Sequence, residues 1–318
     1  MKHLLLCIAA AWLLACAPAS AQDQKRIALS FDDVPRAAGA FLTPDRRTVM
    51  LIAALDRAEV EQAVFFVNPA HLDLPQGAGG EDRIDAYVAA GHVIADHSNT
   101  HPHLNALSAA AYLADIDAAE LWLKGRKGYR PWFRYPFLDE GQGDKAKRDA
   151  VRAGLAARGL GDAYVTSEAS DWNMENLTLE ANAAGKPIDR EALRDLYVQS
   201  HVEAAEFYDG LMRRATGRSP VHVMLLHETD LAAMYIGDLV AALRAGGWDI
   251  VSADEAYADP VGQEATRYDT PSAQGTLTEM LAWQKGLPAP RWYDGNTIAV
   301  ANRRFAERVL HEEAAPTP

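Results

Sequence analysis

Short apolar runs alternate with longer stretches of mixed polarity between about residues 26 and 255 of this 318-residue chain. Such alternation is typical of a parallel sheet whose strands are buried on both faces and connected by helices. The apolar runs predict strands at Arg26–Phe31, Gln62–Val67, His92–Asp96, Trp132–Tyr135, Ala163–Val165, Val221–Leu226 and Trp248–Val251.

Helix start signals lie between these strands. Thr43-Pro44 combines an N-cap residue with proline at the first helical position. Similar signals predict helices over Ser108–Lys124, Asp144–Arg158, Asp189–Thr216 and Gly237–Arg244. About seven strand–helix units without an internal repeat favour a barrel-like α/β fold, and an open doubly wound sheet is the alternative.

The alternation ends at Pro260, where loop residues precede two further predicted helices, Thr276–Lys285 and Asn296–Leu310, and a proline-rich tail. No linker separates this part, so we expect residues 260–318 to be a mainly helical extension packed on a main domain of residues 22–259. Its aromatic residues could stack on sugar rings, but burial against the barrel is the more common outcome for Trp283, Trp292 and Tyr293.

The N-terminus carries an export signal. Lys2 precedes an apolar segment, Leu4–Ala15, that is too short to span a bilayer, and Ala19-Ser20-Ala21 is typical of a signal-peptidase site. Residues 1–21 are therefore predicted to be a signal peptide, and the protein to be periplasmic or secreted, without a transmembrane segment in the mature chain. Alternatively, Leu13–Cys16 resembles a lipobox, which would make the protein a lipoprotein anchored through Cys16.

Composition narrows the function classes. The chain has 31 Lys and Arg against 44 Asp and Glu, a net charge of -13, with 49% hydrophobic residues. These values argue against disorder and against nucleic acid as a partner. Both cysteines, Cys7 and Cys16, lie within the predicted signal segment, so a metal site in the mature chain must use histidine and carboxylate ligands. Nothing in the sequence indicates an oligomeric state.

Polar residues follow five of the predicted strands, where the carboxyl ends of parallel strands meet on one face of the fold. In chain order they are Asp32-Asp33, His97 with His101, Arg134, Asp171-Trp172 and His227. Each alone is more often a turn, an ion pair or a packed side chain. Their joint occurrence at strand ends predicts a single site.

These residues resemble the polysaccharide deacetylase family, also known as carbohydrate esterase family 4 or the NodB homology domain. The motifs are Ser30-Phe31-Asp32-Asp33, His97-Ser98-Asn99-Thr100-His101-Pro102, Arg134-Tyr135-Pro136-Phe137, Asp171-Trp172 and Leu225-Leu226-His227, in the family's order over residues 26–255. The resemblance implies a distorted (β/α)7 barrel of the NodB type that removes acetyl groups from acetylated glycans.

The resemblance also implies roles for individual residues. Asp33, His97 and His101 correspond to ligands of one divalent metal ion, with Zn²⁺ preferred and Co²⁺, Ni²⁺ or Mn²⁺ as alternatives. Asp32 corresponds to the general base oriented by Arg134, and His227 to the general acid supported by Asp171. The positions that correspond to substrate-binding residues are Tyr135, Phe137 with its backbone N–H as oxyanion donor, and Trp172 with Leu225 as walls of the acetyl pocket.

Several positions depart from the family pattern. Val34-Pro35 follows the two aspartates where glycine is usual, Leu138 replaces a glycine, and Glu168 replaces an aspartate. None of them removes a predicted ligand, base or acid. Residues Gln76–Glu81 and Asn173–Pro187 are interpreted as variable rim loops that set specificity.

The leading hypothesis is therefore a metal-dependent deacetylase, preferably of N-acetyl groups on amino-sugar polymers or oligomers. Two enzymatic alternatives are an O-acetyl esterase of the xylan type and a related amidohydrolase acting on a small non-sugar amide. The non-enzymatic alternative is a glycan-binding envelope protein.

Overall fold

The structure is a computed structural model and describes residues 24–312. The predicted signal peptide and Cys16 lie outside the described residues. Within the described part, no helix is both long enough and apolar enough to cross a bilayer.

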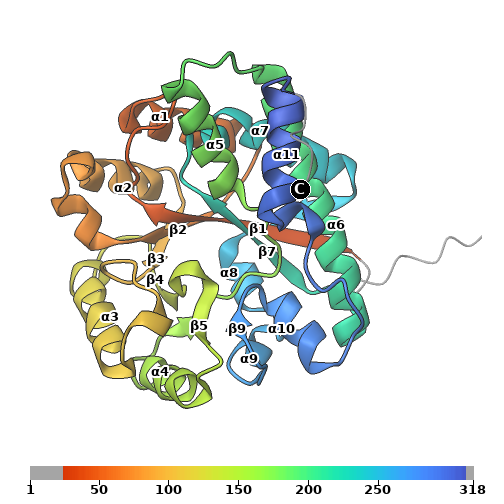
Figure 1. Cartoon of the computed structure of the whole chain (residues 1–318). Coiled ribbons are helices and arrows are strands. Elements are labelled where there is room, and N and C mark those ends of the chain that lie inside the picture. Colours follow the sequence, from red (N-terminus) through yellow and green to blue (C-terminus); the bar gives the residue numbers. More distant parts are fainter. Residues whose placement is uncertain (1–23, 313–318) are drawn as a thin grey trace, which may run out of the picture.

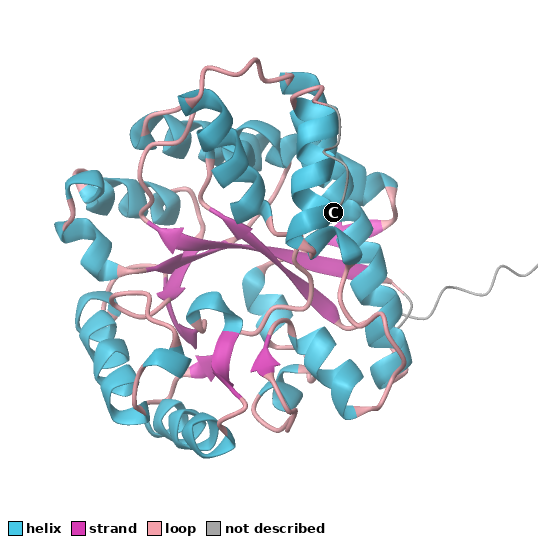
Figure 2. Ribbon diagram, viewed as in Figure 1, coloured by secondary structure: helices cyan, strands magenta, loops and turns pink. Residues whose placement is uncertain are grey.

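Seven parallel strands form one curled sheet, with helices packed around it (Figures 1 and 2). Its order is β6-β4-β3-β2-β1-β7, and β8 also pairs with β1. The strands are β1 Lys25–Val34, β2 Val64–Val67, β3 Val93–Asp96, β4 Tyr129–Phe133, β6 Gly161–Asp162, β7 Val221–His227 and β8 Trp248–Ile250.

The predicted strand at Ala163–Val165 is wrong, because this segment crosses from one edge of the sheet to the other. The Ala163 N–H donates to Phe133 of β4, while the N–H groups of Thr166 and Ser167 donate to Val223 of β7. Ser167 forms a parallel bridge with Met224. A segment that changes partners within four residues forms no regular ladder, and it brings the two edges of the sheet together.

Five predicted helices are confirmed by their caps: the side chains of Thr43, Ser108, Asp144, Asp189 and Thr276 each accept a hydrogen bond from the first turn of the helix that follows. These helices are α1 Pro44–Arg57, α3 Ala109–Leu123, α4 Lys145–Ala157, α6 Arg190–Thr216 and α10 Leu277–Gln284. The remaining helices are α2 Gly80–Ala89, α5 Asp171–Ala183, α7 Asp230–Ala245, α8 Ala253–Tyr257, α9 Gly262–Ala265 and α11 Ile298–Val309, and the short 3₁₀ turns are Pro69–Asp73, Pro75–Gly77, Leu104–Ala106, Pro136–Leu138 and Asp294–Asn296.

Two predicted rim loops need correction. Residues 173–183 belong to α5, and α2 begins at Gly80 within the other predicted loop. The helix predicted at Gly237–Arg244 begins much earlier, at Asp230, because the Thr229 side chain accepts from the Ala232 N–H and caps it directly after β7.

Residues after 260 contact the barrel at several places. In a second, two-stranded sheet, β5 Asp139–Gln142 pairs antiparallel with β9 Ala273–Gln274. Helices α10 and α11 both pack against α6, which Figure 1 shows most clearly for α11. The expectation of burial holds for Tyr293, whereas Trp283 and Trp292 are about half exposed, because the former is stacked under Arg291 at the surface and the latter lies in a loop.

Candidate active site

A cavity of about 480 Å³ opens at the carboxyl ends of β1, β3 and β7. Each of the five predicted motifs contributes at least one residue to its lining, although Arg134 and Tyr135 do not line it. The lining residues are Asp32, Asp33, Arg36, His97, His101, Phe137, Leu138, Glu168, Trp172, Asn176, Leu225, His227, Gln274 and Gly275.

Asp33, His97 and His101 come together at the floor of this cavity. Their ligand atoms all lie within 4.8 Å of one another. Oδ1 of Asp33 is 3.0 Å from Nε2 of His101 and 3.4 Å from Nε2 of His97. One carboxylate and two imidazoles with space in front of them are a donor set that suits a divalent transition metal.

Two further observations test whether these residues fit a metal ion. Nδ1 of His97 lies 2.9 Å from the carbonyl oxygen of Arg134, which can only accept, so in the neutral ring Nε2 carries the lone pair. Oδ1 of Asp33 is buried and has no hydrogen-bond partner among the described residues. Burial alone would raise the pKa of Asp33, but the neighbouring imidazoles of His101 and His97 hold it well below its usual value, so the carboxylate is charged. The cluster therefore fits a cation.

The loop between the two histidines is fixed by its own hydrogen bonds. Ser98 and His101 have positive φ values of 66° and 58°. The Ser98 N–H donates to the Asp96 carboxylate over 2.6 Å, and the His101 N–H donates to the Ser98 hydroxyl over 3.0 Å. Between these two residues, the N–H groups of Asn99 and Thr100 donate to the carboxylate of Asp115 on α3. These bonds stabilise a backbone conformation that side-chain-bearing residues seldom adopt.

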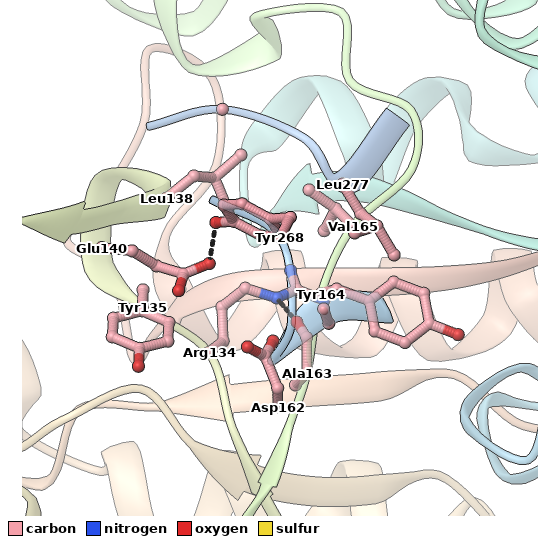
Figure 3. Close-up of a pocket in the computed structure, with 12 residues that line it drawn as sticks. Arg134, Tyr135, Leu138, Glu140, Asp162, Ala163, Tyr164, Val165, Tyr268 and Leu277 are labelled. Atoms are coloured by element: carbon pink, nitrogen blue, oxygen red, sulfur yellow. Dashed lines mark hydrogen bonds between the residues drawn. The ribbon is translucent and has the colours of Figure 1, made fainter. Parts of the chain in front are cut away.

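Asp32 lies beside the ligand cluster and is paired on its other side. Its Oδ1 accepts a hydrogen bond from Nη1 of Arg134 over 2.9 Å, and its Oδ2 is 3.6 Å from Nε2 of His97. Arg134 is almost fully buried, and its remaining N–H groups donate to the Ala163 carbonyl and to the hydroxyl of Tyr257. Figure 3 shows the bond to Ala163. Arg134 therefore does not line the cavity itself, but it holds Asp32 in one orientation.

His227 and Asp171 form a buried pair on the opposite side. Nδ1 of His227 is 2.7 Å from Oδ1 of Asp171, and the His227 N–H donates to Oδ2 over 2.8 Å. Burial alone would lower the pKa of His227, but the charge and hydrogen bond of Asp171 raise it above its usual value. The free ring nitrogen, Nε2, is 4.0 Å from Oδ2 of Asp33 and faces the cavity.

The predicted substrate-binding residues separate into two groups. Phe137, Trp172 and Leu225 line the cavity, and the first two are partly exposed at its mouth. The structure does not bring Tyr135 to this cavity. Its ring packs against Phe133 and lines a separate, small space of about 20 Å³ (Figure 3).

Sequence reasoning missed several residues that line the cavity. Arg36 donates from Nη1 to Oδ2 of Asp33 over 2.5 Å. Gln274 and Gly275 reach the mouth from the extension, where Gln274 donates to the Phe137 carbonyl and Gly275 to the Leu138 carbonyl. Arg36 lies three residues after Asp33, so closeness in the sequence was a usable signal. Nothing in the pattern of β9 marks it as part of a site.

Glu168, noted as a departure from the family pattern, is tied to the extension. Its carboxylate accepts from the Ser170 N–H over 2.8 Å and from the side-chain amide of Asn296 over 2.6 Å. Burial raises the pKa of Glu168, and Asp171 nearby adds to the shift. The Glu168 carboxyl group therefore lines the same cavity as His227 and takes up a proton more readily than an exposed glutamate.

Comparison with known proteins agrees with this geometry. Residues 19–157 match the sequence model described as polysaccharide deacetylase. This part of the chain is similar to polysaccharide deacetylases. The resemblance predicted from the motifs is thereby confirmed, while no curated protein matches the chain.

Solved structures show the same fold at low sequence identity. One neighbour is the chitin deacetylase of the fungal pathogen Colletotrichum lindemuthianum, with 20% identity, 74% of this chain and 89% of that chain covered, and a TM-score of 0.50. Another is a carbohydrate esterase family 4 pseudoenzyme of Bacillus anthracis, with 17% identity, 74% and 66% coverage, and a TM-score of 0.51. The predicted distorted α/β barrel of the NodB type, with a helical C-terminal region, is confirmed.

Proposed function

We propose that this chain is a metal-dependent hydrolase that removes N-acetyl groups from amino-sugar polymers or oligomers. One observation carries the proposal: the ligand atoms of Asp33, His97 and His101 lie within 4.8 Å of one another, beside a second carboxylate that Arg134 holds in place. The similarity to polysaccharide deacetylases supports this reaction class.

In this proposal Asp33, His97 and His101 hold the metal ion, with Zn²⁺ the first choice and Co²⁺, Ni²⁺ or Mn²⁺ as alternatives. When bound, the ion supplies a Lewis acid that polarises the acetyl carbonyl and lowers the pKa of a water molecule. The hydrogen bond from His97 Nδ1 to the Arg134 carbonyl orients the ring so that Nε2 faces the proposed metal position.

Asp32 acts as the general base and takes the proton of the attacking water on Oδ2. Its Oδ1 accepts a hydrogen bond from the Arg134 guanidinium over 2.9 Å, which leaves Oδ2 on the side of the candidate ligand His97. Only 3% of Asp32 is exposed, so bulk water screens this pair weakly.

His227 acts as the general acid and protonates the leaving nitrogen from Nε2. Asp171 fixes the opposite ring nitrogen as a donor and stabilises the charged imidazolium. Leu225 and Trp172 form the walls that hold the acetyl methyl group, and the Phe137 N–H is the oxyanion donor.

An enzyme is favoured over a protein that only binds glycan. The Bacillus anthracis neighbour is a pseudoenzyme, so the fold does not by itself imply catalysis. Glycan binding alone does not require two carboxylates and three imidazoles arranged around one cavity. We also propose export through a signal peptide at residues 1–21, with Cys16 as the alternative lipid anchor, and a domain boundary near residue 259.

Acetate release from the N-acetylglucosamine tetramer by the zinc-loaded protein tests the proposed function. Replacing Asp32 by Asn should lower kcat about a thousandfold at equal metal content, because general-base catalysis contributes roughly this much. Asp56→Asn, at an exposed position on α1, is the matched control and should keep wild-type kcat. Zinc-loaded wild-type protein that binds the tetramer without releasing acetate would contradict the proposal.

A further inference from the structure

Arg134, which pairs with Asp32, has a further buried partner that the proposed reaction does not use. A guanidinium group carries five N–H donors. In Arg134 all five have acceptors among the described residues: the Ala163 carbonyl for Nε, Asp32 and the Ser30 hydroxyl for Nη1, and the same hydroxyl and Tyr257 for Nη2. The contacts to Ser30 are long, at 3.3 and 3.2 Å, whereas the Tyr257 hydroxyl accepts over 2.7 Å. Tyr257 therefore makes the shortest side-chain contact of this group, through the nitrogen that does not donate to Asp32.

The Tyr257 hydroxyl can accept from Arg134 because its own proton is directed elsewhere. It donates to the carbonyl oxygen of Tyr164 over 3.3 Å. Burial raises the pKa of Tyr257 to about 12, although Arg134 opposes the shift, so the hydroxyl keeps its proton at neutral pH. Since a carbonyl oxygen only accepts and a guanidinium group only donates, the direction of both hydrogen bonds is fixed.

Aromatic contacts hold the Tyr257 ring and the face of the guanidinium group. The centroid of the Tyr257 ring lies 4.5 Å from that of Trp132 on β4, and 5.5 Å from that of Tyr164 with the ring planes at 85°. Cζ of Arg134 lies 4.1 Å from the centre of the Phe66 ring on β2. Phe66 thus supports one face of the guanidinium group and Tyr257 holds one edge, so the group cannot turn without losing a contact.

Helix α8, which carries Tyr257, is tied to the strands that lead to the base and to its arginine. The helix follows closely after β8, and β8 pairs with β1. Arg130 of β4 donates to both carboxylate oxygens of Asp254 in α8, over 2.6 and 2.7 Å. Asp32 lies in β1 and Arg134 directly follows β4. The Tyr257 hydroxyl therefore has a set position relative to both members of the pair.

We propose that Tyr257 is a positioning residue for the general base: it fixes the guanidinium group of Arg134, which in turn presents Oδ2 of Asp32 to the attacking water. Tyr257 does not line the active cavity, so it has no direct contact with a substrate bound there. The inference rests on the proposed function and adds a residue that no sequence motif indicated. Without the hydroxyl, a buried N–H group of Arg134 loses its acceptor, and the guanidinium group turns to regain one.

Tyr257→Phe tests the inference, because it removes the hydroxyl and keeps the ring. In acetate release from the N-acetylglucosamine tetramer by zinc-loaded protein, kcat should fall about tenfold, because a small displacement of a reacting group is costly in rate. KM and the zinc content should stay at wild-type values, since neither the cavity lining nor a candidate metal ligand is changed. A raised KM with an unchanged kcat would overturn the inference.

Tyr235→Phe is the matched control. It removes the hydroxyl of another buried tyrosine, which donates to the Arg190 carbonyl over 3.1 Å and does not line the cavity. This variant should keep wild-type kcat. A tenfold loss of kcat in both variants would show a general effect of losing a buried hydroxyl and would also overturn the inference.

A double variant separates positioning of the base from other effects on the rate. In the Asp32→Asn background, Tyr257→Phe should change the residual single-turnover rate by less than about twofold, because the base that Tyr257 orients is already absent. A further tenfold loss in this background would mean that Tyr257 acts by another route, and the inference would fail.

Crystal structures of the metal-free protein test the inference without turnover. In Tyr257→Phe the guanidinium group should turn, and the distance from Nη1 of Arg134 to Oδ1 of Asp32, 2.9 Å in the wild type, should change by about 0.5 Å or more. An unchanged pair would overturn the positioning role. Wild-type protein that binds zinc but releases no acetate would contradict the proposed function instead, and the two crystal structures would still decide whether Tyr257 orients Asp32.

Discussion

The two sides of the active cavity are built differently. The ligand wall, consisting of Asp32, Asp33, His97 and His101, comes from strand ends within the first 101 residues. The acid wall, consisting of Glu168, Trp172, Leu225, His227 and Gln274, is assembled from segments spread over 107 residues.

Within the ligand wall, the loop that carries His97 and His101 is held by contacts close in the sequence, whereas Asp32 is held by Arg134, 102 positions away. Ser98 bonds to Asp96 and His101 bonds to Ser98, all within a single loop. The acid wall is instead held from a distance, as the bond from Asn296 to Glu168 spans 128 positions. The difference teaches that the loop carrying two candidate metal ligands is locally encoded, whereas the acid wall depends on the C-terminal extension.

The largest effect is expected from breaking the ligand wall. His97→Ala removes one imidazole ligand and should reduce acetate release to background and bound zinc to well below one per chain. Metal analysis after dialysis measures this directly. A chelator should lower the melting temperature of the wild-type protein, because an ion at a thousand times its Kd stabilises by about 4 kcal/mol. A variant that keeps one zinc per chain and still responds to the chelator would contradict the assignment.

The acid wall should show a more selective effect. His227→Ala removes the proton donor, which an amine leaving group needs and an alkoxide leaving group needs less. We expect kcat on an N-acetylated sugar to fall by about a thousandfold, and kcat on an O-acetylated sugar by roughly tenfold. Equal losses on both substrates would contradict the assigned role, and faster wild-type turnover of the ester would favour the O-acetyl esterase alternative.

The smallest effect is expected at the support supplied by the extension. Asn296→Ala removes a hydrogen bond to the Glu168 carboxylate and should destabilise the protein by about 1.5–3 kcal/mol, with a severalfold rise in KM. Asn302→Ala is the matched control, because Asn302 accepts from Asn173 and does not line the cavity. An unchanged KM in Asn296→Ala, measured by acetate release, would show that the extension does not shape the acid wall.

Sequence patterns predicted the elements whose signals are local. The caps at Thr43, Ser108 and Asp189 mark helix starts because a single side chain satisfies the first turn. Helix α5 was missed for the opposite reason: its N-cap residue, Ser170, has a φ of 49° and makes no side-chain cap bond. Strand β5 was missed because Asp-Glu-Gly-Gln has neither alternation nor strand-forming residues.

The site was predictable to the same extent. The metal-ligand candidates Asp33, His97 and His101 lie together because β1, which carries Asp33, and β3, which His97 and His101 follow, both pair with β2 in one parallel sheet. The family resemblance predicted that Tyr135 binds substrate, yet its ring packs in the core beside Phe133 and does not line the cavity. Long-range partners such as Gln274 follow from tertiary packing, which a single sequence does not display.

The pairing of β9 with β5 also has a consequence for the order of synthesis. The carbonyl groups of Phe137 and Leu138 accept hydrogen bonds from Gln274 and Gly275. In a growing chain, this part of the cavity mouth takes its final form only when residue 275 has been added.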